Sequence, residues 1–216
     1  MNILITGTTR GIGKAVAIEF INNGHYVIGI DRDEPSIRND NYRHIRWDIT
    51  DYTNTPVINE SIHVLINNAG TQCENDIEVN LTATIKLTER FGIQSNIKSI
   101  VNIASTSAHN GSEFPEYAAS KGGLLAYTKN VAQRVAKYGA TCNSISPGGV
   151  MTELNDHIIH DARLLAKALN ETLLHRWASC AEIAEWVYFM AVVNKSMTGQ
   201  DILVDNGELT KFNFVW

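Results

Sequence analysis

Tyr117 and Lys121 lie four residues apart and carry a phenol and an ammonium group that together can move a proton. A phenol ordinarily ionises with a pKa of about 10, which is too high for a proton shuttle at neutral pH. A nearby ammonium favours the phenolate and lowers that pKa. Because residues four apart share one face of a helix, the spacing predicts that Lys121 lies beside Tyr117. The same spacing also fits an ordinary helix face, so other motifs must decide between the two interpretations.

Three glycines near the N-terminus form a second motif with chemical meaning. Residues 6–13 read TGTTRGIG, and Gly7, Gly11 and Gly13 fall where a first strand meets a first helix. Glycine permits the tight turn and a close approach of a phosphate group, and the helix N-terminus supplies amide hydrogens and the positive end of its dipole. The spacing is not G-x-G-x-x-G, but a plain strand–helix turn needs one glycine rather than three. We therefore predict a dinucleotide site at this turn.

Asp31 ends the second predicted strand and indicates which dinucleotide binds. A carboxylate at this position accepts hydrogen bonds from the ribose hydroxyls of an adenosine. A 2′-phosphate would meet like charge there, so Asp31 favours NAD(H). Arg10 and Arg32 leave NADP(H) open, because arginines near this position can hold a phosphate. Their alternative roles are solvated surface charges or ion pairs with Asp31 or Asp33.

Strands alternate with helices along the whole chain, as hydrophobic periodicity and stop signals indicate. This alternation predicts an α/β fold with a Rossmann-type, doubly wound parallel sheet flanked by helices. Residues 1–216 fit a single domain. The predicted strands cover residues 2–5, 26–30, 44–47, 64–67, 99–103, 141–145 and 201–204. The predicted helices cover residues 11–23, 77–91, a long segment that carries Tyr117 and stops near Gly139, and 183–193 after a capping box at 179–182.

Composition excludes several classes of protein. The net charge of −5 over 216 residues provides no basic surface for nucleic acid. Cys73, Cys142 and Cys180 are far apart without a C-x-x-C motif, which argues against a disulfide framework and fits a reducing compartment. No signal peptide is visible, and no apolar run approaches the roughly 20 residues of a membrane span. We therefore expect a cytoplasmic protein without nucleic-acid or membrane partners.

Six motifs, in this order, resemble those of the short-chain dehydrogenase/reductase family. They are TGTTRGIG, NNAG at residues 67–70, Asn80 in VNLTA, Ser105 in VNIAST, YAASK at residues 117–121 and SPGGVMT at residues 146–152. The resemblance covers nearly the whole chain, and the ordered set is far more specific than any one motif. It implies an oxidoreductase that moves a hydride between nicotinamide C4 and a secondary alcohol or ketone.

The resemblance also implies a role for each motif residue. Tyr117 is expected to be the general acid/base, and Lys121 to lower its pKa and bind the nicotinamide ribose. Ser105 is expected to hydrogen-bond the substrate oxygen, and Asn80 to hold a water molecule that links Lys121 to solvent. The other expected cofactor contacts are Gly7, Arg10, Gly11, Ile12, Gly13, Asp31, Arg32, Asp48, Ile49, Asn68, Ala69, Gly70, Pro147, Gly148, Val150 and Thr152.

Several of these residues have a structural alternative. Ser105 also fits a turn residue at the end of its strand, with Thr106 or Ser107 as competitors for its role. Asn80 also fits the surface of an amphipathic helix, and Thr152 fits a helix N-cap.

Two segments are shorter than the family pattern. Few residues separate Asp48 from Asn67, and the usual helix there is reduced to about residues 55–61. Only TQCENDIEV separates Gly70 from Asn80. These short segments motivate an alternative from another class, an NAD-binding sensor with little catalysis. The intact catalytic set argues against that alternative, since a sensor has no need of a proton path.

The substrate side is expected to include residues 107–114 and the segment after Thr152. Apolar side chains in residues 153–175 predict a mobile helical lid over an apolar pocket, or alternatively a part of the core. His157 and His160, with His109 in reach, have no supporting ligand cluster, so we expect no metal.

The C-terminal sequence carries apolar side chains that need a partner. Phe212, Phe214, Val215 and Trp216 are expected to pack on the chain's own core or across a symmetry axis. The family resemblance implies a homotetramer, or a homodimer through the helices beginning near Ile77 and Glu116.

Overall fold

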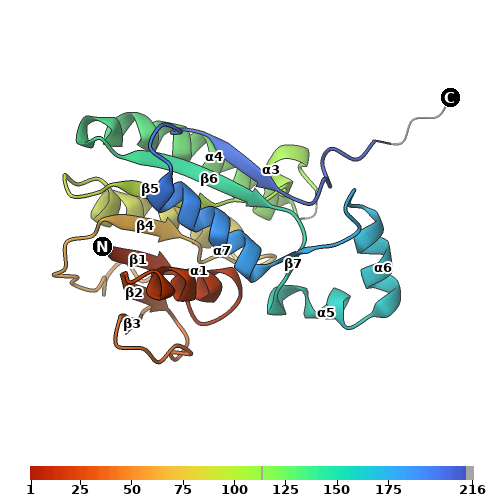
Figure 1. The fold of residues 1–216 in the computed structure, drawn as a ribbon, viewed down its shortest axis with the longest axis horizontal. Helices are drawn as coiled ribbons and strands as arrows, with labels where there is room; N and C mark the ends of the chain where they lie inside the picture. Colours follow the sequence, from red (N-terminus) through yellow and green to blue (C-terminus); the bar gives the residue numbers. More distant parts are fainter. Residues whose placement is uncertain (113, 213–216) are drawn as a thin grey trace.

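A seven-stranded, wholly parallel sheet forms the centre of the computed structural model, which describes residues 1–112 and 114–212 (Figure 1). The strands lie in the order β3-β2-β1-β4-β5-β6-β9, so the chain builds one half outward from β1 and then returns to add the other. The predicted doubly wound α/β fold is confirmed. The strands are β1 (Asn2–Thr6), β2 (Tyr26–Asp31), β3 (Tyr42–Arg46), β4 (Val64–Asn67), β5 (Ser99–Ile103), β6 (Thr141–Pro147) and β9 (Asp201–Val204).

The inner strands are buried on both faces, which explains why their sequences are continuous apolar runs rather than alternating ones. In β1, Ile3, Leu4 and Ile5 are all fully buried. Ile3 and Ile5 belong to one hydrophobic core and Leu4 belongs to the other, because successive side chains point to opposite faces. Each face of the sheet therefore needs a layer of helices to cover its hydrophobic core.

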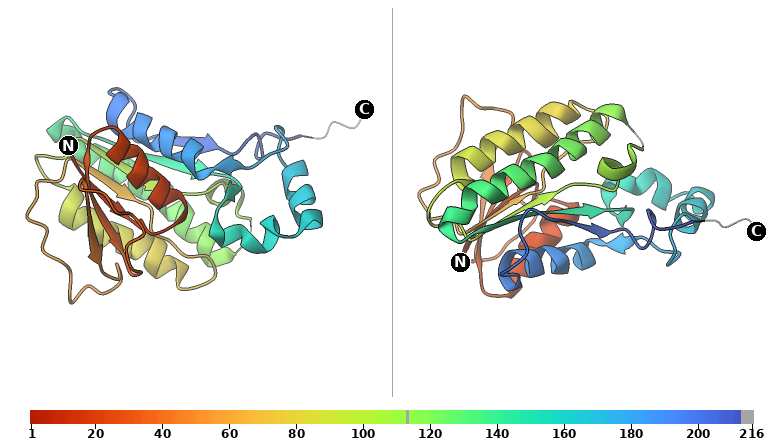
Figure 2. Two further views of the ribbon diagram at one scale, coloured as in Figure 1. Left: turned by 60° about the horizontal axis from the view of Figure 1, so that its bottom comes forward. Right: turned by 90° about the horizontal axis from the view of Figure 1, so that it is seen from above.

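Those helices cover the two faces as separate layers, which the right panel of Figure 2 shows with the sheet seen nearly edge-on. The helices α1 and α7 pack together on one face. The long α4 and the helical segment running from η1 to η2 pack on the other. The bounds are α1 (Gly11–Asn22), η1 (Ile77–Ala83), α2 (Thr84–Leu87), η2 (Thr88–Gly92), α3 (Ser107–Asn110), α4 (Pro115–Val135), η3 (Ala136–Tyr138), α7 (Cys180–Tyr188) and η5 (Phe189–Val193).

The predicted helix signals are also present. Gly24 and Gly139 adopt positive φ angles of 75° and 69° just after their helices end. Ser179 and Glu182 form a capping box, with the Ser179 side chain accepting from the Glu182 N–H.

A smaller helical extension lies beyond the carboxyl ends of the strands, at the right of Figure 1. It contains η4 (Glu153–Asn155), α5 (Asp156–Ile159) and α6 (Ala162–Asn170), and it is flanked by the two-stranded pair β7 (Val150–Met151) and β8 (Ala178–Ser179). No residue of α6 is buried, so its leucines are not part of the core. The segment is therefore helical as expected, and its mobility stays a prediction.

The prediction of a short helix at residues 55–61 is wrong, because this segment has no regular secondary structure. Pro56 disfavours the helical conformation of Thr55, and seven residues provide little helical stability by themselves. Side-chain bonds hold the segment instead: Thr55 Oγ1 donates to Tyr52 O, and Glu60 pairs with Arg43 at 3.0 Å.

The prediction that the C-terminal apolar side chains pack on the chain's own core or across a symmetry axis can be tested only at Phe212. Phe212 is 71% exposed and is therefore not packed into this chain's core. Phe214, Val215 and Trp216 lie outside the described residues.

Candidate active site

A cavity of about 300 Å³ opens beyond the carboxyl ends of β1, β2, β4, β5 and β6. The strand order reverses between β1 and β4, and ligands of open α/β sheets bind at that point. The cavity is lined by Gly7, Arg10, Gly11, Ile12, Ile30, Asp31, Arg32, Asp33, Trp47, Asp48, Ile49, Asn68, Ala69, Gly70, Thr71, Val79, Ile103, Ala104, Ser105, Tyr117, Lys121, Pro147, Gly148, Val150, Thr152, Glu153, Leu154 and Asn155.

The glycine turn connects β1 to the N-terminus of α1. Gly7 and Gly11 have φ angles of 76° and 56°, which side-chain-bearing residues rarely adopt. Asn68 braces the turn, since its side-chain amide donates to Thr6 O at 2.9 Å and to Gly7 O at 3.1 Å. The turn thus presents backbone amides and a helix N-terminus to the cavity, as an anion site requires.

Gly13 is predicted as a cofactor contact, but the structure does not place it on the cavity wall. A Cβ at Gly13 would lie 2.0 Å from Gly7 O and 2.3 Å from Asn68 Nδ2. Gly13 therefore serves the close packing of α1 against the turn, one of the separate tasks that glycines perform in such loops.

Asp31 lies at the end of β2 with its carboxylate held on both oxygens. Oδ2 accepts hydrogen bonds from Thr9 N at 3.0 Å and Thr9 Oγ1 at 2.9 Å, and Oδ1 accepts from Asp33 N at 3.1 Å. The alternative of an ion pair is present at Arg10, whose guanidinium lies 3.8 Å from the carboxylate of Asp33 in an exposed contact. Arg32 lines the same end of the cavity.

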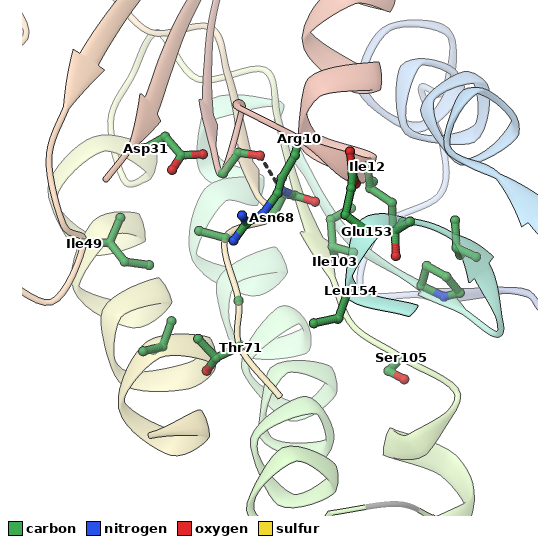
Figure 3. A pocket seen from close by; sticks show the side chains of 18 of the residues that line it. Arg10, Ile12, Asp31, Ile49, Asn68, Thr71, Ile103, Ser105, Glu153 and Leu154 are labelled. Atoms are coloured by element: carbon green, nitrogen blue, oxygen red, sulfur yellow. Dashed lines mark hydrogen bonds between the residues drawn. The ribbon is translucent and has the colours of Figure 1, made fainter. Parts of the chain in front are cut away.

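Asp48 and Ile49 line the cavity near Asp31, and Figure 3 shows Ile49 and Asp31 on the same side of it. Asp48 Oδ1 accepts from Thr50 N at 2.9 Å and from Thr50 Oγ1 at 2.7 Å, which fixes the turn after β3. Trp47 completes this side and was not predicted.

Tyr117 and Lys121 share one face of α4, as their spacing predicts. Lys121 Nζ lies 5.6 Å from the centre of the Tyr117 ring and donates to Ile103 O at 2.9 Å. Lys121 is 5% exposed. Burial lowers the pKa of its ammonium to about 8, against the opposite effect of the Asp76 carboxylate.

Ser105 follows β5 and lines the cavity, whereas Thr106 and Ser107 do not. Its Oγ accepts a hydrogen bond from Ser107 N at 3.2 Å and lies 3.3 Å from Ser107 Oγ. Ser105 is therefore both a turn residue and the serine that faces the cavity. Figure 3 shows it at the end of the cavity away from Asp31.

Asn80 is 1% exposed and does not line the cavity. Its Oδ1 accepts from Thr71 N at 2.8 Å, and its Nδ2 donates to Thr71 O at 3.0 Å and to Ser120 Oγ at 3.1 Å. Asn80 and Lys121 both lie close to Gly70, because a Cβ there would lie 2.9 Å from Asn80 Oδ1 and 3.5 Å from Lys121 Nζ. Asn80 is thus a buried helix residue rather than a surface one.

The short loop before Asn80 is closed by a buried carboxylate that sequence reasoning missed. Asp76 is 1% exposed and accepts from Thr71 Oγ1 at 2.9 Å and Cys73 N at 3.0 Å. A carboxylate inside a short loop of turn-forming residues was the available signal. The loop places Thr71 on the cavity wall.

The segment after β6 closes the opposite wall with the predicted Pro147, Gly148, Val150 and Thr152. Thr152 occupies the N-cap position of η4, as the alternative predicts, but its side chain makes no capping hydrogen bond. The wall continues into Glu153, Leu154 and Asn155, at the start of the segment that is expected to face the substrate.

The histidines considered as metal ligands are dispersed. His160 lies 3.9 Å from Asp156, and His109 lies 2.9 Å from Asp201. Within residues 1–112 and 114–212, no group of three or more potential ligands lies together. In the same part of the chain, no helix is long and apolar enough to cross a membrane.

Comparison with known proteins identifies the class that this fold and site define. A family model described as enoyl-(acyl carrier protein) reductase matches residues 7–208. The chain is 31% identical to the 3-oxoacyl-(acyl-carrier-protein) reductase of Buchnera aphidicola subsp. Schizaphis graminum, with 94% of this chain and 95% of the relative covered.

Solved structures agree with the sequence comparison. A 4-hydroxyisoleucine dehydrogenase complexed with NADH superimposes with a TM-score of 0.89 at 26% identity, covering 98% of this chain and 99% of the other. A short chain dehydrogenase family protein from Francisella tularensis superimposes with a TM-score of 0.83 at 28% identity, covering 97% and 99%. The chain belongs to the short-chain dehydrogenase/reductase family and is an oxidoreductase of the NAD(P)(H)-binding type.

Proposed function

We propose that the protein transfers a hydride between NAD(H) and a secondary alcohol or ketone, with Tyr117 as the general acid/base. The observation that carries this proposal is the buried Lys121 beside Tyr117, on the same cavity as Ser105. The cavity fits a dinucleotide, because a glycine turn and a carboxylate line one end and the proton-transfer residues line the other.

The chain's own residues supply everything except the hydride, which the bound nicotinamide provides. Ser105 donates a hydrogen bond to the substrate oxygen, where negative charge develops during reduction. Tyr117 delivers a proton to the same oxygen, and in the reverse direction it removes that proton. General acid/base catalysis of this kind contributes roughly 10²–10⁴-fold in rate.

Lys121 makes this proton transfer possible at neutral pH. Its buried ammonium stabilises the Tyr117 phenolate and holds the nicotinamide ribose. Asn80 supports this group from the other side of Gly70, to which both side chains lie close, and through Ser120 on α4. A water molecule on the second lone pair of Asn80 Oδ1 would continue the proton path to solvent.

The other cavity residues are assigned to three parts of the cofactor: the adenosine, the pyrophosphate and the nicotinamide carboxamide. We assign the adenosine to Asp31, Asp48, Ile49, Asn68, Ala69 and Gly70, and the pyrophosphate to the turn at Gly7, Arg10, Gly11 and Ile12. Pro147, Gly148, Val150 and Thr152 are assigned to the nicotinamide carboxamide.

NAD(H) is favoured by the way Asp31 is held. Thr9 and Asp33 fix its carboxylate at the end of β2, where a 2′-phosphate would meet like charge. The 4-hydroxyisoleucine dehydrogenase is complexed with NADH, which agrees with this choice. Arg10 and Arg32 keep NADP(H) as the competing cofactor.

The substrate class follows from the proton-transfer group and agrees with the relatives. A 3-oxoacyl group is a ketone, and 4-hydroxyisoleucine is a secondary alcohol, so both names belong to the proposed reaction class. An NAD-binding sensor is the less favoured function, because Ser105, Tyr117 and Lys121 all line the cavity.

Tyr117→Phe tests the reaction by removing only the hydroxyl that moves the proton. Turnover of NADH with a panel of ketones, followed by nicotinamide absorbance, should fall by about 10²-fold or more. The NADH dissociation constant of the variant should stay near that of the wild type. Full turnover in Tyr117→Phe contradicts the proposed mechanism, and tight NADH binding without wild-type turnover on the panel supports the sensor.

Asp31→Ala tests the cofactor by comparing NADH and NADPH affinities before and after the change. Loss of the ribose hydrogen bonds should weaken NADH binding by about tenfold, and loss of the charge should strengthen NADPH binding. A wild-type preference for NADPH rejects the NAD(H) assignment.

The proposal includes a homotetramer or homodimer in the cytoplasm. Ile77, on the first helix of the expected interface, is 39% exposed. Trp186 and Phe189 on the opposite layer are each 43% exposed and offer a second apolar contact. Cys73, Cys142 and Cys180 form no disulfide within residues 1–112 and 114–212, which fits a reducing compartment. Light scattering after size exclusion measures the assembly, and a monomer at micromolar concentration rejects it.

A further inference from the structure

His109 lies outside the cavity and joins α3 to the edge of the sheet. Its Nε2 lies 2.9 Å from Asp201 Oδ2, in β9, and 3.3 Å from Ser146 Oγ, in β6. The His109 and Asp201 side chains are 31% and 15% exposed, so water reaches the contact mainly from the His109 side. None of the motifs that define the site includes this pair.

The geometry excludes one chemical role for the cluster. In a Ser–His–Asp catalytic arrangement the serine and the carboxylate contact opposite ring nitrogens. Here Ser146 and Asp201 both contact Nε2. Because an ionised carboxylate only accepts hydrogen bonds, Nε2 carries the hydrogen and donates it to Asp201. His109 is therefore an anchor rather than a base.

Asp201 is a rigid attachment point for this anchor. Its other oxygen, Oδ1, accepts from Ser144 Oγ at 2.6 Å. Ser144 and Asp201 are also paired in register between β6 and β9. The sheet thus holds Oδ1 through Ser144 and leaves Oδ2 to His109, so a partner on α3 is fixed relative to the strands.

The helix α3 needs such an anchor because it has only four residues, Ser107–Asn110. Isolated helices this short are unstable and depend on tertiary contacts. The first residue of α3 is the partner of Ser105 Oγ, which accepts from Ser107 N at 3.2 Å and donates to Ser107 Oγ at 3.3 Å. A displacement of α3 would therefore move the partners that orient Ser105 Oγ.

We propose that His109 is a positioning residue for the reaction: by donating to Asp201 it fixes α3, and α3 fixes the direction of the Ser105 hydroxyl toward the substrate oxygen. The inference rests on the proposed function, because it gives Ser105 a role in stabilising the developing charge. It extends that role to His109 and Asp201. These two residues do not touch the substrate and act on Ser105 through α3.

A double-mutant cycle between His109 and Ser105 tests this coupling. His109→Ala should lower kcat for ketone reduction by about tenfold, within the range of measured couplings between residues linked by a backbone shift, and should leave the NADH dissociation constant unchanged. His109→Gln, which retains an N–H donor at similar reach, should restore most of kcat. In the Ser105→Ala background, His109→Ala should cause no further loss, since the hydroxyl that it positions is already gone.

His63→Ala is the matched control for a purely structural histidine. His63 Nδ1 accepts from Asn2 N at 3.0 Å, at the opposite end of the sheet. This variant should lower the midpoint of thermal unfolding without changing kcat. If His109→Ala does not fold, Asp201→Asn replaces it in the same cycle, because the amide keeps the shape but weakens the charged hydrogen bond.

The outcomes separate the inference from the function on which it rests. Unchanged kcat in Ser105→Ala rejects the role of Ser105 itself. A strong effect of Ser105→Ala together with unchanged kcat in His109→Ala overturns the positioning role of His109. Equal loss of kcat from His109→Ala with and without Ser105 also overturns it, because that result means His109 acts independently of the serine.

Discussion

The glycine turn and the helical extension at residues 153–175 face the same cavity but are built in different ways. The turn is held by backbone contacts and by fully buried strands on both sides. The extension consists of short helices, and α6 has no buried residue. Leu154 and Leu164 are 59% and 43% exposed. Several positions of the glycine turn therefore accept only glycine, whereas the exposed positions of the extension accept many different residues.

Gly13→Ala is expected to show the largest difference between the two regions. The added Cβ would lie 2.0 Å from the backbone oxygen of Gly7, which cannot move without moving the turn. We expect a loss of about 3 kcal/mol or more in the free energy of unfolding. Leu164→Ala in α6 should change it by less than about 0.5 kcal/mol. Urea denaturation measures both.

Gly122→Ala is the control for glycine replacement as such. The nearest atom to a Cβ at Gly122 is Ala108 O at 3.9 Å, so the helix should gain up to about 1 kcal/mol. Similar stabilities for Gly13→Ala and Leu164→Ala would contradict the comparison.

The same difference explains what the sequence predicts well. The strands of the sheet are recognisable because burial on both faces requires continuous apolar runs, and four predicted boundaries at β4 and β9 agree with the structure to the residue. The glycine turn and the Tyr117–Lys121 spacing are local, so a short stretch of sequence suffices to place them on one cavity.

Interactions between distant segments were harder to predict. The hydrogen bonds from Thr71 to Asp76 and from His109 to Asp201 depend on how loops fold, and no periodicity marks them. Residues 55–61 resembled a reduced helix because the family pattern was extended over a segment that contains Pro56. Glu153 and Leu154 line the cavity where the chain after β7 passes the glycine turn, with Glu153 Oε2 3.7 Å from the place of a Cβ at Gly11.

Lys121 gives the second prediction, a stability that rises with pH. Burial lowers the pKa of its ammonium from 10.5 to about 8, so the fold disfavours the charged form. Below pH 8 both the folded and the unfolded chain hold the proton, and the penalty is constant. Between about pH 8 and 10.5 the unfolded chain binds more protons, so stability increases with pH through this window, by about 3 kcal/mol in total.

Lys121→Met isolates this contribution, since methionine fills the space without a proton to lose. The wild type should gain stability relative to this variant as pH rises from 8 to 10, measured by urea denaturation. Identical slopes for the two proteins would show that the Lys121 pKa is not lowered by burial. Activity should change in the opposite direction, because loss of the Lys121 charge removes the stabilisation of the Tyr117 phenolate.

Glu153 lies where the helical extension meets the glycine turn. Its replacement gives the third prediction, a change in NADH affinity, which is the smallest expected effect. A Cβ at Gly11 would lie 3.7 Å from Glu153 Oε2, and Figure 3 shows Glu153 beside Ile12 at the turn. A carboxylate there repels the pyrophosphate that we assign to this turn. The group is exposed, so water screens most of the repulsion. Glu153→Gln should therefore tighten NADH binding by only about threefold at low ionic strength.

The salt dependence of that change decides whether the extension acts on the cofactor through charge. The gain in Glu153→Gln should decrease as the salt concentration rises, because the Debye length falls from about 30 Å at 0.01 M to about 10 Å at 0.1 M. Glu171→Gln, an exposed carboxylate just after α6 that does not line the cavity, should leave NADH affinity unchanged. A threefold gain that persists at high salt would instead point to a change of shape at the turn. No gain at any salt concentration would mean that the extension and the glycine turn are electrostatically independent, and that the extension affects the substrate alone.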